Sequence, residues 1–312
     1  MTTIATAPTS TRSERYRAAE NELWRSYGLQ PRERFLDIDS PPARLRVLEV
    51  ESGEPVLFVH GTVGPGGWPS LICELPGFRA IVLDRPGWGM SSAIDYSQAN
   101  YGALVADVLR GTLDALEIER AHMVGGSIGN VWALRLAERY PARVGRVVLL
   151  GSGPMVDEAG VPGFIRLLAS PIGALMLRLP DKPDRVRSIL RRSGHGASLD
   201  AGLIPDEFVD WRMALARETA SMRNERRMVT AIVNGKSYRP GLTFDDTELA
   251  GIRRPILHVL GTTDHVGSVD VWRRFADRLP QAELHVVEQA GHMPWFDDPA
   301  GVARVVRGFL ES

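Results

Sequence analysis

The sequence predicts an α/β fold in which helices cover both faces of a mostly parallel sheet. Short β-branched or apolar runs alternate with segments of helical spacing, which is the pattern of such a sheet. Some runs are apolar without interruption, as in PVLFVHG at 55–61, which is typical of strands buried on both faces. A long, mainly helical interval from about 152 to 250 contains no convincing strand, so we expect a helical insertion between two strands.

The chain begins with a segment that precedes this alternation. Residues 1–13 are rich in Thr, Ala and Ser and predict a mobile tail. Residues 13–29 predict an amphipathic helix that Ser13 can cap and that packs against the body of the domain. Four large side chains fall on roughly one side of this helix: Tyr16, Leu23, Trp24 and Tyr27.

The predicted core follows in chain order, and its first two strands have the appearance of an antiparallel pair. The expected strands are 34–38, 44–50, 55–61, 79–84, 121–127, 146–151, 255–261 and 282–288. The expected helices are 101–116, 129–140, 269–279 and 299–312. The predicted organisation is therefore an N-terminal tail and helix at 1–33, an α/β core at 34–151 and 250–312, and a helical insertion at 152–249.

The composition disfavours several classes of protein. The chain has 312 residues and a formal net charge of -1, so a nucleic acid or an acidic membrane surface is not an expected partner. Cys73 is the single cysteine, which rules out an intramolecular disulfide and suits a reducing compartment. No secretory signal and no apolar run of about 18 residues is present. We therefore expect a cytoplasmic protein with a small-molecule substrate, and its oligomeric state stays open.

The stretch HMVGGSIGN at 122–130 surrounds one serine with glycines. It places Ser127 in a G-x-S-x-G pattern between a predicted strand and a predicted helix, the setting of a nucleophile elbow. Gly125 and Gly129 allow strand and helix to approach closely, and the helix amides face the space above the serine. The alternative is an ordinary Gly/Ser-rich loop, because the pattern also arises by chance; the flanking elements favour the nucleophile.

A serine hydroxyl needs a base, and the base needs an orienting carboxylate. The sequence has seven histidines: His60, His122, His195, His258, His265, His285 and His292. His292 follows the predicted strand 282–288, at the carboxyl end where parallel sheets gather their chemistry; the alternative is a surface-loop histidine. Asp264 follows the strand 255–261 in the same way and is the favoured acid. Asp157 is a rival, since it also lies past a strand end.

The stretch VLFVHGTVGPGGW at 56–68 predicts an oxyanion hole. Its glycines let backbone amides approach a ligand, and the amides of Thr62 and Ile128 are the natural pair of donors. No G-K-[ST] follows, so a phosphate-binding P-loop is excluded. Nothing in the sequence has the spacing of a metal cluster, and we expect no cofactor and no metal.

Five motifs in this order resemble those of the α/β-hydrolase fold superfamily, near its capped esterases, carbon–carbon bond hydrolases and haloperoxidase-like members. The motifs are His60-Gly61, DRPGWGMSS at 84–92, GGSIG at 125–129, GTTD at 261–264 and Gly291-His292. The resemblance implies an eight-stranded, mostly parallel sheet with a helical cap at 152–249. It also implies Ser127 as nucleophile, His292 as base, Asp264 as acid, and an oxyanion hole at Thr62 and Ile128.

The expected function is hydrolysis of a small or medium, mostly apolar carboxylic ester through an acyl-enzyme. Carbon–carbon bond, lactone and thioester hydrolysis use the same residues and stay open, and a slow-turnover or non-hydrolytic receptor is the alternative of another class. The apolar cap helices predict a greasy roof over the site. Cap arginines such as Arg187 and Arg191 are interpreted as part of a solvated mixed-charge face rather than as an anion site.

Overall fold

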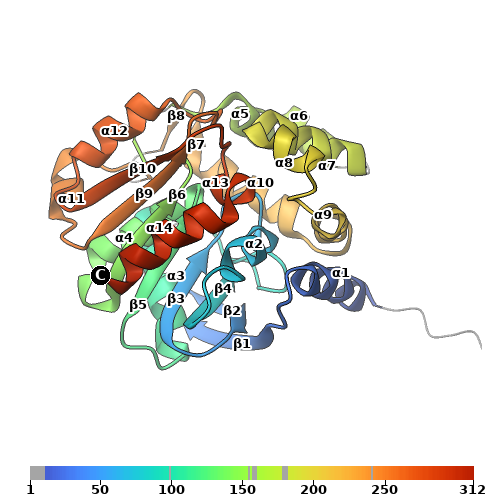
Figure 1. Cartoon of the computed structure of the whole chain (residues 1–312), viewed down its shortest axis with the longest axis horizontal. Coiled ribbons are helices and arrows are strands. Elements are labelled where there is room, and N and C mark those ends of the chain that lie inside the picture. The colour runs from blue at the N-terminus through green and yellow to red at the C-terminus, as the bar shows by residue number, and fades with distance from the viewer. Residues whose placement is uncertain (1–10, 98–99, 154, 157–159, 178–181, 240–241) are drawn as a thin grey trace, which may run out of the picture.

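An eight-stranded sheet forms the centre of the molecule (Figure 1). The computed structural model describes residues 11–97, 100–153, 155–156, 160–177, 182–239 and 242–312. The strand order is β1-β2-β4-β3-β5-β6-β9-β10, with antiparallel pairing of β1 with β2 and of β2 with β4 and parallel pairing elsewhere. The predicted mostly parallel, eight-stranded sheet is therefore confirmed.

The strands match the predicted segments to within a few residues. They are β1 (Arg32–Asp39), β2 (Pro42–Val50), β3 (Glu54–Val59), β4 (Phe78–Asp84), β5 (Ala121–Gly126), β6 (Val144–Leu150), β9 (Ile256–Gly261) and β10 (Ala282–Val287). Strands β3, β5 and β6 lie in the middle of the sheet, and nearly all of their residues are buried, as expected for strands covered on both faces.

Helices cover both faces of the sheet and bury two apolar clusters. One face carries α3 (Tyr101–Ala115), α4 (Ile128–Arg139) and α12 (Val269–Asp277). The other carries α1 (Arg12–Ser26), α2 (Pro69–Ile72) and α14 (Pro299–Glu311). The short elements η1 (Pro65–Gly67), η2 (Pro141–Arg143), α11 (Asp246–Gly251) and α13 (Pro294–Asp297) complete the core.

Helix α1 begins one residue after Thr11, so the prediction that Ser13 caps it is wrong. The Thr11 hydroxyl accepts a hydrogen bond from the Glu14 amide at 3.3 Å, and the Glu14 carboxylate accepts one from the Thr11 amide at 2.6 Å. This reciprocal capping box satisfies two backbone donors at once, which one serine inside the first turn does not do. Residues 1–10 of the predicted tail lie outside the described residues, as does Asp157.

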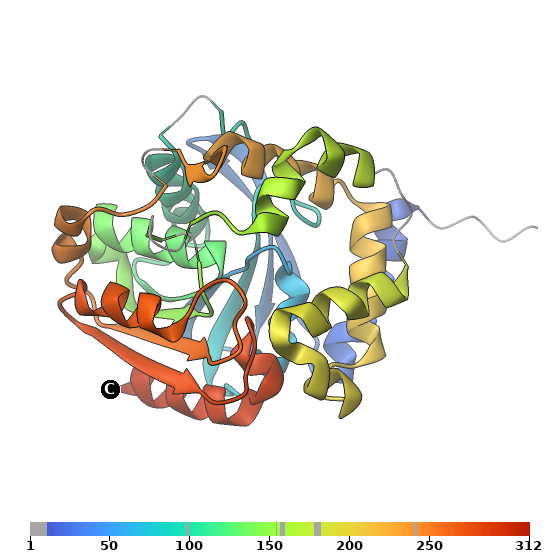
Figure 2. The same cartoon turned by 90° about the horizontal axis from the view of Figure 1, so that it is seen from above.

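The insertion lies between β6 and β9, which are neighbours in the sheet. Its helices are α5 (Gly163–Ala169), α6 (Pro171–Met176), α7 (Pro183–Leu190), a π-helical turn (Arg191–His195), α8 (Gly196–Asp200), α9 (Asp206–Glu218) and α10 (Ser221–Ile232). These green-to-gold helices gather together in Figures 1 and 2. The expectation that the insertion has no strand is wrong, because β7 (Val233–Asn234) and β8 (Ser237–Tyr238) form a short hairpin.

Helix α1 lies between the core and the insertion. It packs against α9, and the Arg15 guanidinium forms an ion pair with Glu218 at 2.8 Å. Tyr16, Leu23 and Trp24 are buried in an apolar cluster that contains residues of both the sheet and α9. The helix therefore does more than the predicted packing on the body of the domain, since it also contacts the cap.

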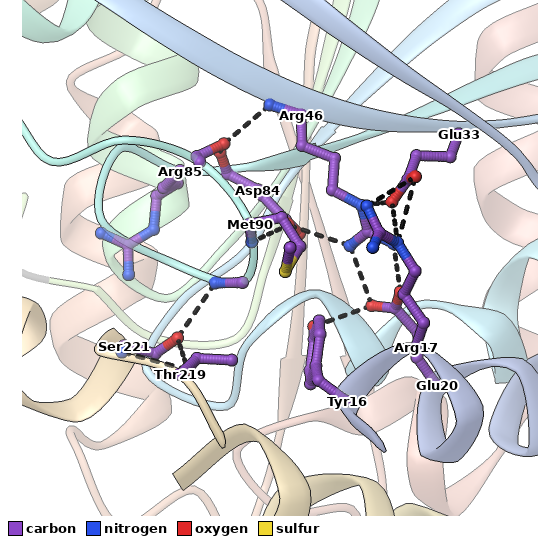
Figure 3. A network of polar contacts seen from close by, with 12 residues as sticks. Tyr16, Arg17, Glu20, Glu33, Arg46, Asp84, Arg85, Met90, Thr219 and Ser221 are labelled. Carbon is purple, nitrogen blue, oxygen red and sulfur yellow. Dashed lines mark hydrogen bonds and ion pairs between the residues drawn. The ribbon is translucent and has the colours of Figure 1, made fainter. Parts of the chain in front are cut away.

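A buried ionic cluster joins α1 to the sheet (Figure 3). The Arg46 guanidinium on β2 pairs with Glu20 of α1, with Glu33 of β1 at 2.6 Å and with Asp84 at the end of β4 at 3.0 Å. The Tyr16 hydroxyl donates to Glu20 at 2.8 Å. Because Arg46, Glu20 and Asp84 are almost fully buried, each charge depends on the others for its compensation.

Candidate active site

Ser127 lies at a sharp turn between β5 and α4. Its backbone has φ 55° and ψ -120°, and its amide donates to the Leu150 carbonyl at 3.1 Å. A Cβ atom at Gly129 would collide with the Val59 carbonyl oxygen on β3, and one at Gly125 would lie 2.6 Å from the Gly129 carbonyl oxygen. Both flanking glycines are therefore required for the close approach of strand and helix that the sequence predicted.

Asp264 and His292 form a buried pair. Both carboxylate oxygens of Asp264 lie 3.0 Å from Nδ1 of His292, and 1% of the Asp264 side chain is exposed. The carboxylate also accepts hydrogen bonds from the amides of Val266 at 2.9 Å and Ser152 at 3.0 Å. With Nδ1 donating to Asp264, Nε2 of His292 is the ring nitrogen that can take up a further proton.

The charge state of Asp264 follows from these contacts. Burial alone would raise the pKa of its carboxyl group, but the neighbouring His292 and the two backbone N–H donors outweigh burial and hold this pKa below its usual range. Asp264 is therefore ionised at neutral pH, and its negative charge favours a positive charge on the imidazole ring.

Ser127, Asp264 and His292 all contact one tripeptide, residues 151–153, which directly follows β6. A Cβ atom on its first residue would collide with the His292 carbonyl oxygen, and one on its last would lie 2.5 Å from the Ser127 carbonyl oxygen. Its middle residue donates its amide to Asp264. The structure thus brings the predicted nucleophile, acid and base together around the carboxyl end of β6.

A small cavity opens beside Ser127. Both predicted oxyanion residues, Thr62 and Ile128, line it together with Ser127. The remaining lining residues are Gly153, Pro162, Phe164, Ile165, Glu225, Val229, Ile232, Tyr238 and Val266. The cap supplies the greater part of this lining, mostly as apolar side chains, which agrees with the expected greasy roof.

His60 supports the corner that carries Thr62. Its ring is fully buried; Nδ1 lies 2.7 Å from the Gly61 carbonyl oxygen, and the Arg85 amide donates to Nε2 at 3.2 Å. Burial and the nearby Arg85 guanidinium lower the pKa of His60, so the ring is neutral and donates from Nδ1. A Cβ atom at Gly61 would lie 2.6 Å from the Ser127 Cβ, which shows how closely this corner approaches the serine.

Two other histidines lie away from the site and behave as structural residues. His258 on β9 is fully buried, and burial lowers its pKa to about 4, so its ring is neutral. His122 lies at the far end of β5 from Ser127; its Nε2 is 2.8 Å from the Glu54 carboxylate, and burial lowers its pKa.

His195 has a supporting role that the sequence did not reveal. It is fully buried in the insertion, and its Nδ1 lies 2.8 Å from Asp297, which also accepts hydrogen bonds from Ser198 and the Gly291 amide. The His292 amide donates to the Ser193 carbonyl at 2.9 Å. The cap therefore braces the loop that carries His292, through residues about 100 positions away in the chain.

Glu225 is the other site residue that the sequence did not reveal. It lies on α10 and contributes a carboxylate to a cavity whose remaining described lining is free of charged side chains. Its partners are Arg85 at 3.0 Å and Trp88 at 2.7 Å, both in the DRPGWGMSS motif. The motif was visible in the sequence, but nothing in the sequence connects it with a helix about 140 positions later.

Other features of the described residues concern metals and membranes. No group of three or more His, Cys, Asp or Glu side chains among them has a metal-binding arrangement. None of the helices resolved in this part of the chain is both long and apolar enough to cross a bilayer.

The cap arginines lie on the exposed surface in ion pairs, as expected for a mixed-charge face. Arg187 pairs with Asp206 at 2.7 Å, and Arg191 pairs with Asp200 at 2.5 Å.

Comparison with known proteins defines the class. The alpha/beta hydrolase fold model matches residues 54–299, so the chain belongs to the α/β-hydrolase fold family. A 2-hydroxy-6-oxononadienedioate/2-hydroxy-6-oxononatrienedioate hydrolase of Paraburkholderia phymatum is 30% identical over 289 residues, which cover 89% of this chain and 95% of the relative. A 2-hydroxy-6-oxo-6-phenylhexa-2,4-dienoate hydrolase of Burkholderia cepacia is 28% identical over 275 residues, which cover 86% and 92%.

Solved structures show the same fold. Naproxen esterase from Bacillus subtilis superimposes with a TM-score of 0.74 at 22% identity, covering 97% of this chain and 100% of the esterase. The 2-hydroxy-6-oxo-6-phenylhexa-2,4-dienoate hydrolase from Rhodococcus sp. strain RHA1 gives 0.75 at 21% identity, covering 91% and 100%. The chain is thus a hydrolase of the α/β fold. The names of its sequence relatives match the carbon–carbon alternative rather than the ester hydrolysis expected first.

Proposed function

We propose that the chain is a serine hydrolase of compact, mostly apolar carboxylic esters. The observation that carries this proposal is the composition of the cavity beside Ser127. Its described lining is mostly apolar: three side chains carry hydroxyl groups, the Glu225 carboxylate is the one charged group, and no lysine, arginine or histidine is included. A substrate that buried a carboxylate of its own there would lack a cation to pair with, so a neutral acyl compound fits best.

The arrangement supports acyl transfer. Ser127 Oγ attacks the ester carbonyl while Nε2 of His292 takes its proton, and the ionised Asp264 stabilises the resulting imidazolium. The amides of Thr62 and Ile128 donate to the oxyanion. The alcohol leaves with the proton from His292, and water then hydrolyses the acyl-enzyme by the same route. The proposed roles use only residues of this chain.

Steady-state turnover of p-nitrophenyl butyrate tests the proposal. We expect many turnovers per Ser127, and labelling of Ser127 by a fluorophosphonate that abolishes them. A single burst of one equivalent without further turnover would support a slow-turnover receptor instead. Labelling at a different serine would overturn the assignment of the nucleophile.

A second candidate is hydrolysis of a carbon–carbon bond in a 2-hydroxy-6-oxodienoate, because two relatives at 28–30% identity are named as hydrolases of such compounds. The attacked carbonyl is then a ketone, and the carbon that leaves must take up the proton from His292. Parallel assays with p-nitrophenyl butyrate and 2-hydroxy-6-oxo-6-phenylhexa-2,4-dienoate separate the candidates. A kcat/KM higher by about 100-fold for the ester supports the first, and the reverse ratio supports the second.

A further inference from the structure

Glu225 is a buried carboxylate whose two oxygen atoms differ: one accepts two hydrogen bonds, and the other accepts none from the described residues. Its side chain is fully buried and lines the cavity beside Ser127, Thr62 and Ile128. The Oε2 atom accepts from Arg85 Nη2 at 3.0 Å and from Trp88 Nε1 at 2.7 Å. The Oε1 atom is equally buried, yet no donor among the described residues reaches it.

The position of Glu225 is fixed from both sides. Glu225, Val229 and Ile232 follow the helical spacing of one face of α10, and all three line the cavity. Arg85 is held in turn, since its side chain is fully buried and its Nη2 also donates to the Gly61 carbonyl at 3.2 Å. The carboxylate is therefore not free to turn its second oxygen toward water.

We propose that Glu225 is a substrate-binding residue whose Oε1 accepts a hydrogen bond from an uncharged O–H or N–H group of the substrate held at Ser127. A buried acceptor without a partner in the protein is rare and costly, so it points to a donor on the ligand. Arg85 already compensates the negative charge, so the site suits a hydroxyl or an amide N–H rather than an ammonium group.

This inference deepens the proposed function and rests on it for the reaction at Ser127. It defines the preferred substrate as an apolar acyl compound that carries one hydrogen-bond donor. The donor would pair with the one charged side chain of a mostly apolar described lining. A substrate without the donor would leave Oε1 buried and unpaired, which is how buried polar groups discriminate strongly between otherwise similar ligands.

The variant Glu225→Gln tests the assignment because its orientation is dictated by the structure. Arg85 and Trp88 both donate to the atom at the Oε2 position, so the amide oxygen must take that position. The amide NH2 then takes the position of Oε1. The substitution converts an acceptor into a donor at nearly constant volume.

The readout is the ratio of kcat/KM for p-nitrophenyl 3-hydroxybutyrate to that for the 3-methoxy ester, which accepts but does not donate. We expect the wild type to favour the hydroxy ester by about ten- to hundredfold, since hydrogen bonds to charged groups are strong. In Glu225→Gln the ratio should fall to about one, because the hydroxyl and the methoxy oxygen can both accept a hydrogen bond from the amide NH2. Ile232→Val, which trims an apolar wall of the same cavity, should change both rates by the same factor.

A binding experiment separates this inference from the proposed function. In a Ser127→Ala background, where no chemistry occurs, benzyl alcohol should bind more tightly than benzyl methyl ether, and Glu225→Gln should remove this preference. Such selectivity without ester hydrolysis in the wild type would overturn the proposed function alone. Ester hydrolysis with equal ratios in wild type and Glu225→Gln, or absence of any preference for the alcohol, would overturn the role of Glu225.

Discussion

At the scale of the residue, Ser127 is both the proposed nucleophile and a residue with a strained backbone conformation. A non-glycine residue with φ 55° costs about 1–3 kcal/mol and persists only where its surroundings fix it. We expect Ser127→Gly to be more stable than Ser127→Ala by about 1 kcal/mol, because glycine adopts positive φ without a Cβ penalty. Urea denaturation of both variants measures this difference.

Both variants should lose ester hydrolysis by a factor on the order of 10³–10⁶, as serine triads do without their nucleophile. Equal stability of the two variants would show that the turn is unstrained. Residual activity above about a tenth of the wild type would contradict the role of Ser127.

The acid can be tested against two other aspartates. Asp264→Asn should reduce kcat by a factor on the order of 10³–10⁴, because an amide selects the wrong imidazole tautomer. Asp270→Asn is a matched control, since Asp270 lies in the first turn of α12 and is 75% exposed. Asp157→Asn tests the alternative candidate for the catalytic acid that the sequence suggested. A larger loss in Asp157→Asn than in Asp264→Asn would move the acid to the segment after β6.

At the scale of the element, the loop that carries His292 depends on the cap. Asp297→Ala removes the acceptor of His195, Ser198 and the Gly291 amide, so we expect kcat to fall with little change in KM. Asp298→Ala is the control, because the Asp298 carboxylate accepts a hydrogen bond from the Gly301 amide at the start of α14. It should cost about 1 kcal/mol in the free energy of unfolding, as helix caps do, and leave kcat unchanged. Equal kcat in both variants would contradict the brace.

The elements that the sequence predicted best are those whose signal is local. Apolar runs gave the buried strands β3, β5 and β6, and glycines around Ser127 gave the elbow, since both reflect steric needs of neighbouring residues. The predicted boundaries failed where local alternatives compete. Thr11 displaced Ser13 as the cap, and a hairpin at 233–238 interrupts the helical insertion.

The site residues show the same difference between local signals, which the sequence reveals, and long-range contacts, which it does not. Ser127, Asp264 and His292 each follow a strand end, and a shared sheet edge brings strand ends together. Glu225 and His195 act through partners about 100 to 140 positions away, on helices whose placement depends on tertiary packing. No spacing in one sequence encodes such pairs.

At the scale of the whole molecule, the buried cluster around Arg46 makes stability depend on pH. Burial raises the pKa of Asp84 from 3.8 to about 6, so between these values the folded state binds the Asp84 proton more tightly than the unfolded chain does. The contribution of Asp84 to the free energy of unfolding should therefore decrease as the pH rises from about 4 to 6 and stay constant above it.

Urea denaturation at several pH values measures this dependence. Asp84→Asn should lose that part of the slope, whereas Asp270→Asn, at an exposed position, should keep it. An unchanged slope in Asp84→Asn would show that another group of the cluster holds the proton.

If the substrate is an ester, we expect the cap as a whole to set the acyl-chain preference. Its apolar residues close over a cavity of limited volume, and each buried methylene adds at most about 0.8 kcal/mol of binding. Activity on p-nitrophenyl esters should rise from acetate to a maximum among short to medium chains and then fall, with no jump at an oil–water interface. A maximum at the longest soluble chain, or interfacial activation, would indicate an open lid.

The pair of Arg85 and Glu225 also limits how this chain can be recombined. Arg85 belongs to the core and Glu225 to the cap, and both are fully buried. A cap transplanted from a relative with an apolar residue at the position of Glu225 would leave the guanidinium without its anion, at a cost of about 3–5 kcal/mol. Chimeric enzymes built on this core should therefore fold poorly unless Arg85 is exchanged together with the cap. The core and the cap are thus expected to be compatible only as a matched pair at this position.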